Sequence, residues 1–187
     1  MKIKTKRLIL RTPTRDDFEF LKSMWENGEV MKFVGFPNGL KQTDEKIYQW
    51  IENCQANEKL RLVIEDKASH RAIGETGYRF DIEYPFVKGK KSVAPDIKLI
   101  PEFWGKGLAT EALTALIDCI FKNTDAEIIQ MAPNVKNKAA LSLYKKLGFR
   151  KIGKPRIDKI GLGKNKIVPD VPVEYQYMEM RKYENHL

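Results

Sequence analysis

The stretch DIKLIPEFWGKGLATEALTALIDCIF, residues 96–121, contains a strand, a glycine turn and a helix in direct succession. The apolar residues 97–100 predict a short strand, which Pro101 ends because proline has no N–H to donate to a ladder. Gly105 and Gly107 predict a tight turn. Apolar residues then recur at i, i+3 and i+4, the period of one buried helix face. This face contains Leu108, Ala112, Leu113, Leu116, Ile117, Ile120 and Phe121.

A helix that begins directly after a glycine turn is suited to binding an anion. Its first backbone N–H groups have no partner within the helix, and the positive end of the helix dipole lies at the same point. Glycine lets a ligand approach the backbone closely, and phosphate is the usual occupant of such a site. The same spacing also suits an ordinary glycine turn into a core helix, so the pattern alone leaves both interpretations open.

The segment PEFWGKGLATEAL resembles the acyl-coenzyme A (acyl-CoA) binding motif of the GNAT N-acetyltransferases, Q/R-x-x-G-x-G/A. Trp104 takes the Q/R place and departs from the pattern, Gly107 is the first glycine, and Ala109 is the final G/A. The resemblance is closest to the RimJ/RimL-like branch, which acetylates protein N-termini and other amines. It implies coenzyme contacts, mostly through the backbone, from Leu99, Ile100, Trp104, Gly105, Lys106, Gly107, Leu108, Ala109 and Thr110.

A second motif lies in NVKNKAALSLYKKLGF, residues 134–149. Asn137 suits a helix N-cap and Gly148 suits the C′ position, and the apolar residues between them predict an amphipathic helix that needs no function. The pattern N-x-x-A-x-x-x-Y-x-x-x-G-F also resembles the second GNAT signature. That resemblance implies that Tyr144 is the general acid for the leaving thiolate, and it adds coenzyme contacts from Asn137, Ala140, Leu143 and Tyr144.

Composition indicates one globular domain, residues 1–187. The chain has no apolar run of roughly 18–20 residues and no signal peptide, so we expect a cytoplasmic protein without a membrane segment. Its net charge of +9 favours anionic partners such as CoA or a ribosomal surface. Nucleic acid is not expected, because no RNP-like aromatic pattern is present. Cysteine and histidine spacing predicts no metal site.

The remaining pattern predicts an α/β (α+β) domain of the GNAT type. We expect a mixed, mostly antiparallel sheet of about six to seven strands flanked by about four helices, with a parallel pair at the coenzyme site. The parallel partner of residues 97–100 is a buried strand at 127–132, because a helix crosses between the two. Polar segments interrupt the chain at 84–91 and 158–172; the second contains GLGKNK, which lacks P-loop spacing. Other predicted strands are 7–11, 60–66, 71–80, 92–100, 150–154 and 173–182, the last two forming a hairpin.

The resemblance places the acceptor site against the first two helices, where Met31, Phe33, Phe36 and Trp50 either line the site or form plain core. The attacking amine must be neutral, so a base is needed. Glu75 and Asp96 are equal candidates for that base, Glu111 of the coenzyme turn is another, and a water chain could replace them. A backbone N–H near Leu99 or Ile100 is the expected oxyanion donor.

Together these features predict an N-acetyltransferase that uses acetyl-CoA. Its acceptor is a primary amine, which attacks directly and belongs to a protein N-terminus, such as that of a ribosomal protein, or to a small molecule. Two alternatives remain: a nucleotide enzyme, for which the Lys-Ser/Thr pair of a phosphate loop is missing, and a non-catalytic CoA- or RNA-binding module. The protein is expected to be a monomer or a homodimer.

Overall fold

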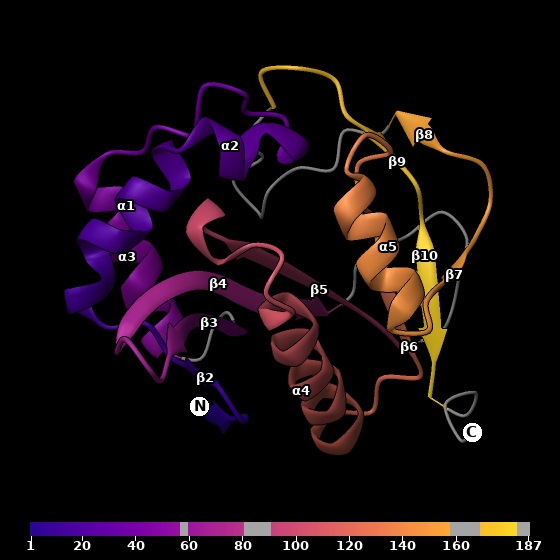
Figure 1. Cartoon of the computed structure of the whole chain (residues 1–187), viewed down its shortest axis with the longest axis horizontal. Coiled ribbons are helices and arrows are strands. Elements are labelled where there is room, and N and C mark those ends of the chain that lie inside the picture. Colours follow the sequence, from indigo (N-terminus) through magenta and orange to yellow (C-terminus); the bar gives the residue numbers. More distant parts are fainter. Residues whose placement is uncertain (57–59, 81–90, 158–168, 183–187) are drawn as a thin grey trace.

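The computed structural model describes residues 1–56, 60–80, 91–157 and 169–182 (Figure 1). A central sheet runs through these residues with helices against both of its faces. Residues 84–90 of the predicted polar excursion lie outside the described residues. The same holds for residues 158–168 of the predicted long loop, including GLGKNK.

The main sheet has eight strands in the described residues, in the order β1-β2-β3-β4-β5-β6-β10-β7. All neighbours pair antiparallel except β5 and β6, which pair parallel, as the sequence predicts. The bounds are β1 Lys2–Lys4, β2 Leu8–Arg11, β3 Leu60–Asp66, β4 Arg71–Phe80, β5 Ser92–Leu99, β6 Ile128–Met131, β7 Arg150–Lys151 and β10 Met178–Arg181.

Five α-helices and three short 3-10 helices lie in the described residues. The α-helices are α1 Phe18–Glu26, α2 Gly28–Met31, α3 Asp44–Gln55, α4 Leu108–Asn123 and α5 Lys138–Lys146. The 3-10 helices are η1 Arg15–Asp17, η2 Lys32–Val34 and η3 Pro101–Phe103. Side chains cap the starts of two of these helices: Thr14 and Asp17 form a capping box before η1, and the Thr43 hydroxyl accepts from the amide of Lys46 in α3.

The two faces of the sheet carry different helices because side chains alternate along each strand. On β3, Leu62 and Ile64 point into a core that α4 and α5 cover, whereas Val63 points into a core that α1, α2 and α3 cover. Every residue predicted for the buried face of α4 is buried except Phe121, which is half-buried. The sheet therefore separates a face carrying α4 and α5 from a face carrying α1–α3.

The parallel contact between β5 and β6 is shorter than predicted and lies elsewhere. Ser92 pairs with Ile128 and Val93 with Ile129, at the start of β5 rather than at residues 97–100. Beyond Val93, β5 continues for six residues along β4 alone. The two strands therefore part in the direction of the glycine turn, and the backbone of β5 faces an open side there.

The C-terminal hairpin is only partly as predicted. β7 and β10 pair antiparallel, but β7 contains just two residues. Residues 156–157 and 174–175 leave the main sheet and form a separate ladder, β8 Arg156–Ile157 with β9 Glu174–Tyr175. Edge strand β1, which pairs with β2, was not predicted.

Candidate active site

The glycine turn between β5 and α4 is exposed and open. Gly105 (φ +72°) and Gly107 (φ +73°) both have left-handed backbone conformations, which cost other residues roughly 1–2 kcal/mol. A Cβ atom added at Gly105 would meet no atom within 4 Å. Gly107 is the N-cap of α4, and no side chain caps this helix end. The first amides of α4 are therefore placed to donate to an anionic ligand.

The residues predicted to contact the coenzyme around this turn differ in how far their side chains are exposed. Leu108 points its side chain into the core, so only its backbone can meet a ligand there. Ala109 and Thr110 are half-buried, and Lys106 is exposed with its Nζ 4.9 Å from the ring centroid of Phe103. Backbone contact is thus the main mode of binding that this turn offers.

At the end of β5, the backbone groups of one residue point away from β4, toward the side where β6 no longer pairs with β5. The amide of Ile100 donates to the carbonyl of Ile73 on β4 (3.0 Å), so it is already engaged. Opposite residues in an antiparallel ladder alternate between hydrogen-bonded and non-hydrogen-bonded pairs. The next pair, Leu99 with Gly74, is therefore of the second kind, and the N–H and C=O of Leu99 point away from β4. Of the two predicted oxyanion donors, the geometry favours Leu99.

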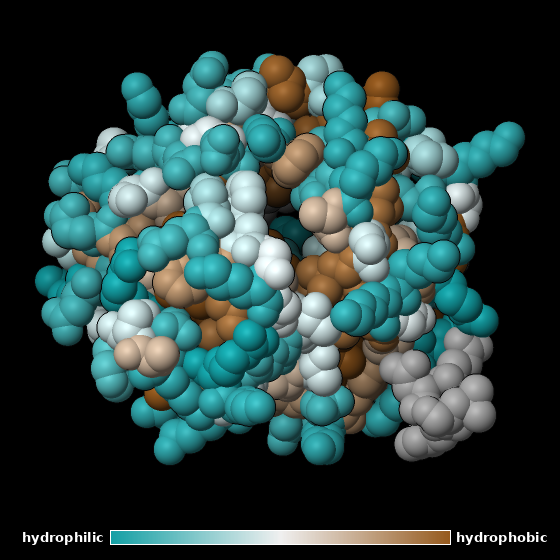
Figure 2. Space-filling view, viewed as in Figure 1, coloured by the Kyte–Doolittle hydropathy of each residue, from teal (hydrophilic) through white to brown (hydrophobic). Residues whose placement is uncertain are grey.

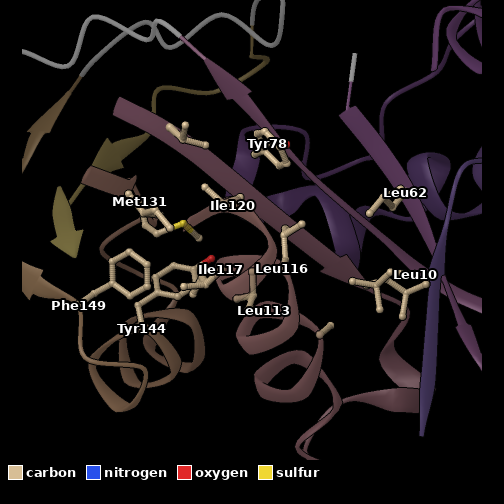
Figure 3. Close-up of a cluster of buried hydrophobic side chains, with 14 of the residues drawn as sticks. Leu10, Leu62, Tyr78, Leu113, Leu116, Ile117, Ile120, Met131, Tyr144 and Phe149 are labelled. Atoms are coloured by element: carbon tan, nitrogen blue, oxygen red, sulfur yellow. The ribbon is translucent and has the colours of Figure 1, made fainter. Parts of the chain in front are cut away.

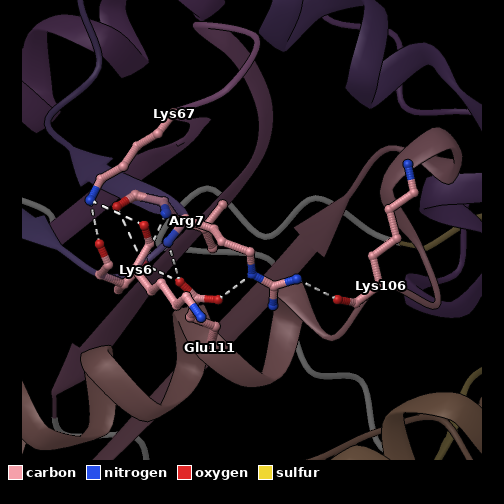
Figure 4. A network of polar contacts seen from close by, with 7 residues as sticks. Lys6, Arg7, Lys67, Lys106 and Glu111 are labelled. Atoms are coloured by element: carbon pink, nitrogen blue, oxygen red, sulfur yellow. Dashed lines mark hydrogen bonds and ion pairs between the residues drawn. The ribbon is translucent and has the colours of Figure 1, made fainter.

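A network at the start of α4 connects the turn to the N-terminal strands (Figure 4). Glu111, a candidate base from the sequence, accepts from Thr5 Oγ1 (2.6 Å), from the Arg7 amide (2.7 Å) and from Arg7 Nε (2.7 Å). Arg7 Nη1 donates to the carbonyl of Lys106 (2.8 Å). Glu111 therefore fixes the N-terminal segment and is not placed to act as a base. Arg7 was missed by the sequence interpretation.

Helix α5 has both of its predicted caps. The Asn137 side chain accepts from the amide of Ala140 (3.0 Å), so it is committed to the helix start. Gly148 (φ +94°) follows the helix, and its amide and that of Phe149 donate to Lys145 and Tyr144 (3.0 and 2.9 Å). This is the Schellman arrangement. Ala140 and Leu143 pack partly against the core.

Tyr144 lies on the inner side of α5. It is 7% exposed, and its ring packs against Phe149 with 5.9 Å between centroids. Figure 3 shows the ring pointing from α5 toward Ile117 of α4. The two caps therefore hold the tyrosine between the helices that carry the two sequence motifs.

Four charged side chains form a cluster on the sheet face that carries α1–α3. Arg61 on β3 bonds Asp96 on β5, while Lys98 donates to Glu75 Oε1 on β4 (2.8 Å) and lies 3.5 Å from Asp96 Oδ2. Strand register places Glu75 opposite Lys98 and next to Val63, which packs against α1–α3. Glu75 is 3% exposed, and its Oε2 is buried without a hydrogen-bond partner in the described chain. An unpaired buried carboxylate oxygen is costly, so it marks a place for a donor.

The charges around Asp96 weaken its case as the catalytic base. Burial by itself raises the pKa of Asp96, but the charges of Arg61 and Lys98 outweigh it, and the pKa lies well below its ordinary value. Burial lowers the pKa of Lys98, and the charges of Glu75 and Asp96 reverse this, so its pKa is raised. Asp96 is therefore a weak base and Lys98 a firmly held cation. Arg61 and Lys98 were missed as site residues, although each is a cation with an apolar residue on both sides in its strand.

The predicted acceptor wall divides into core and surface. Met31 and Phe36 are 1% and 3% exposed and belong to the core under α1–α3. Phe33 and Trp50 are half-buried, and the ring of Trp50 lies edge-on to Trp25 at 5.1 Å. Figure 2 shows a hollow near the middle of the face viewed in Figure 1, with hydrophilic atoms at its bottom. Only Phe33 and Trp50 keep exposed surface for an acceptor.

Within the described ranges, no three histidine, cysteine or acidic residues are grouped so that they could hold a metal ion. In the same ranges, no helix has both the length and the apolarity to cross a membrane.

The parted β5 and β6, the glycine turn and the tyrosine-bearing helix define a GNAT-type acetyltransferase. The family model for the acetyltransferase (GNAT) domain matches residues 7–150. The chain belongs to this family.

Two relatives of similar length are named N-acetyltransferases. An uncharacterized N-acetyltransferase, YoaA of Bacillus subtilis, is 26% identical over 153 residues, covering 81% of this chain and 84% of the relative. The spermidine N(1)-acetyltransferase of Vibrio cholerae is 27% identical over 143 residues, covering 76% and 79%.

Solved structures agree on the fold. A GNAT-family acetyltransferase from Bacillus anthracis superposes with a TM-score of 0.73 at 20% identity, covering 97% of this chain and 98% of that one. A Vibrio cholerae spermidine N-acetyltransferase in complex with CoA and spermine superposes with a TM-score of 0.72 at 22% identity, covering 94% and 95%.

Proposed function

We propose that this protein transfers the acetyl group of acetyl-CoA to a primary amine, which attacks the thioester directly. The observation that carries this proposal is the open turn at Gly105 and Gly107, which precedes an uncapped helix start beside the parted strands β5 and β6. The amides of residues 107–110 suit the diphosphate of the coenzyme. The outward-facing amide of Leu99 suits the rest of an extended ligand, because it offers a donor there, while the Leu99 carbonyl already accepts from the indole of Trp104.

Two residues then serve the acyl transfer. The Leu99 amide donates to the oxygen that gains negative charge when the amine attacks. The hydroxyl of Tyr144 gives its proton to the departing CoA thiolate, which leaves as a thiol. Holding amine and thioester together supplies much of the acceleration in addition to these steps.

Glu75 is the proposed base for the amine. Its Oε2 is the buried oxygen without a partner, so it can accept an N–H of the amine and then take the proton that the amine loses on attack. Lys98 holds the other oxygen of Glu75 and fixes its orientation. Asp96, with its lowered pKa, remains ionised, and the cations Arg61 and Lys98 balance its charge.

The acceptor that fits these residues is a molecule with a primary amine at Glu75, the rest of which contacts Phe33 and Trp50. Both a small polyamine and a protein N-terminus, including one on a ribosomal protein in the RimJ/RimL manner, meet this requirement. The spermidine acetyltransferases among the relatives support the small amine. The remaining expectations, a cytoplasmic location and a monomer or homodimer, belong to the same proposal.

Thermal melting and thiol release test the proposal together. Acetyl-CoA and CoA are expected to raise the unfolding midpoint, whereas ATP and RNA are not. Free CoA thiol should then appear from acetyl-CoA when spermidine, aminoglycosides, amino acids or N-terminal peptides are added. Stabilisation without thiol release on any amine would support the alternative of a non-catalytic CoA-binding module. No stabilisation by CoA would refute both.

A further inference from the structure

Arg7 connects three parts of the molecule through one guanidinium group. It lies between β1 and β2, and it bonds Glu111 on the first turn of α4 through Nε (2.7 Å). Through Nη1 it bonds the carbonyl of Lys106 inside the glycine turn (2.8 Å). Figure 4 shows the side chain reaching across from the N-terminal strands to the turn. The link joins parts of the chain that are distant in sequence, because Arg7 and Glu111 are 104 positions apart.

The third nitrogen of Arg7 faces the turn. Nη2 has no hydrogen-bond partner among the described residues, and it lies 3.6 Å from where a Cβ of Gly107 would stand. The side chain of Arg7 is 44% exposed, whereas that of its partner Glu111 is 18% exposed. A guanidinium that is held by two bonds and keeps Nη2 free can donate a charge-assisted hydrogen bond to a phosphate oxygen through that nitrogen.

We infer that Arg7 is a positioning residue for the coenzyme: it holds the glycine turn in its open shape and offers Nη2 to the coenzyme diphosphate. The bond to Lys106 sets the direction of the turn's carbonyl, so that the neighbouring amides point outward. Glu111 is needed because it fixes the guanidinium and balances its charge. This inference rests on the proposed function and assigns to that site a residue that lies outside both sequence motifs.

The test compares Arg7→Ala, Arg7→Lys and the matched control Arg71→Ala. Arg71 is a comparably exposed arginine (side chain 55% exposed) whose ion pair, with Glu102 on η3 (3.1 Å), lies ahead of the turn. Affinity for CoA is measured by calorimetry without any amine, and hydrogen exchange of residues 104–110 is measured in the ligand-free protein. We expect Arg7→Ala to weaken CoA binding about tenfold, as loss of charge-assisted hydrogen bonds implies. Exchange in the turn should become faster, and Arg71→Ala should change neither quantity more than about twofold.

Arg7→Lys separates geometry from charge. Lysine keeps the positive charge but cannot bond Glu111, Lys106 and a phosphate in one plane, so we expect it to recover only part of the affinity. Full recovery would overturn the positioning role, as would an Arg7→Ala protein that matches Arg71→Ala in affinity and exchange. If the wild-type protein binds no CoA, the proposed function fails, whereas exchange in the ligand-free protein still decides whether Arg7 holds the turn.

Discussion

The indole Nε1 of Trp104 donates a hydrogen bond to the carbonyl oxygen of Leu99 at 2.6 Å. Trp104 stands where the family motif has Gln or Arg, and the residue is 44% exposed at the start of the glycine turn. The bond ties the turn back to the end of β5, next to the amide that we assign to the oxyanion. The unusual tryptophan therefore has a structural role in joining the two halves of the proposed coenzyme site.

Trp104→Phe removes this donor and keeps an aromatic ring. A hydrogen bond of this kind contributes about 1 kcal/mol net, so CoA affinity should fall about fivefold. Calorimetry with CoA measures this change. Trp50→Phe, on the acceptor side, should leave the affinity for CoA as it is. Equal affinities for the wild type and Trp104→Phe would show that the Leu99 carbonyl does not need the indole.

Gly107→Val should abolish stabilisation by CoA. The left-handed conformation at this position is an outlier for a β-branched residue, so the turn must change shape. The measurement is the unfolding midpoint with and without saturating CoA. Gly153→Ala is the control, because Gly153 also has a positive φ (+61°) but follows β7, away from the turn. A Gly107→Val protein with the full wild-type shift would place the coenzyme elsewhere.

Tyr144→Phe should keep the fold and lose the chemistry. The ring contact with Phe149 remains, while the hydroxyl that protonates the thiolate is gone. We expect turnover to fall about 10²–10⁴-fold, with CoA affinity within about threefold of wild type. Thiol release and calorimetry give the two numbers. Wild-type turnover in this variant would remove Tyr144 from the role of acid.

Asp17 should make the stability of the fold sensitive to acid. Burial alone raises the pKa of Asp17, but bonds from Arg11 (both 2.8 Å) and from the Thr14 amide outweigh it, so the folded-state pKa lies below the ordinary 3.8. A lowered folded pKa adds stability that is fully present above about pH 5 and is lost as the pH falls through 3.8 toward the folded value. Urea unfolding at pH 7, 5 and 3 measures this slope.

Asp17→Asn is the matching variant. It should lower the unfolding free energy at pH 7 by about 2 kcal/mol, since a charge-assisted pair and a cap are both weakened. Its stability should also decline less between pH 5 and pH 3 than that of the wild type. Parallel stability curves for the two proteins would mean that other carboxylates cause the acid dependence.

Features that depend on near neighbours could be predicted from the sequence. The helix of α5 is an example, because Asn137 and Gly148 act within three or four residues of themselves. Short-range chemistry leaves few alternatives in such cases.

Features that depend on distant partners could not be predicted. The link from Arg7 to Glu111 and the pairing of β1 exist only after the sheet has assembled. The division of the acceptor wall is of the same kind, since Met31 and Phe33 are both apolar but only Met31 points into the core. The length of the β5–β6 contact could not be predicted either, because the apolar pattern of two parallel strands does not show where they diverge.

The cluster of Arg61, Glu75, Asp96 and Lys98 is formally neutral, with two cations and two anions on one sheet face. An ammonium entering beside it would leave one surplus positive charge in a poorly solvated place, which is unfavourable. A free base adds no charge and still offers an N–H to Glu75. The fold would then select the uncharged form of its acceptor from solution, and the catalytic efficiency would climb with pH until the amine itself is fully titrated.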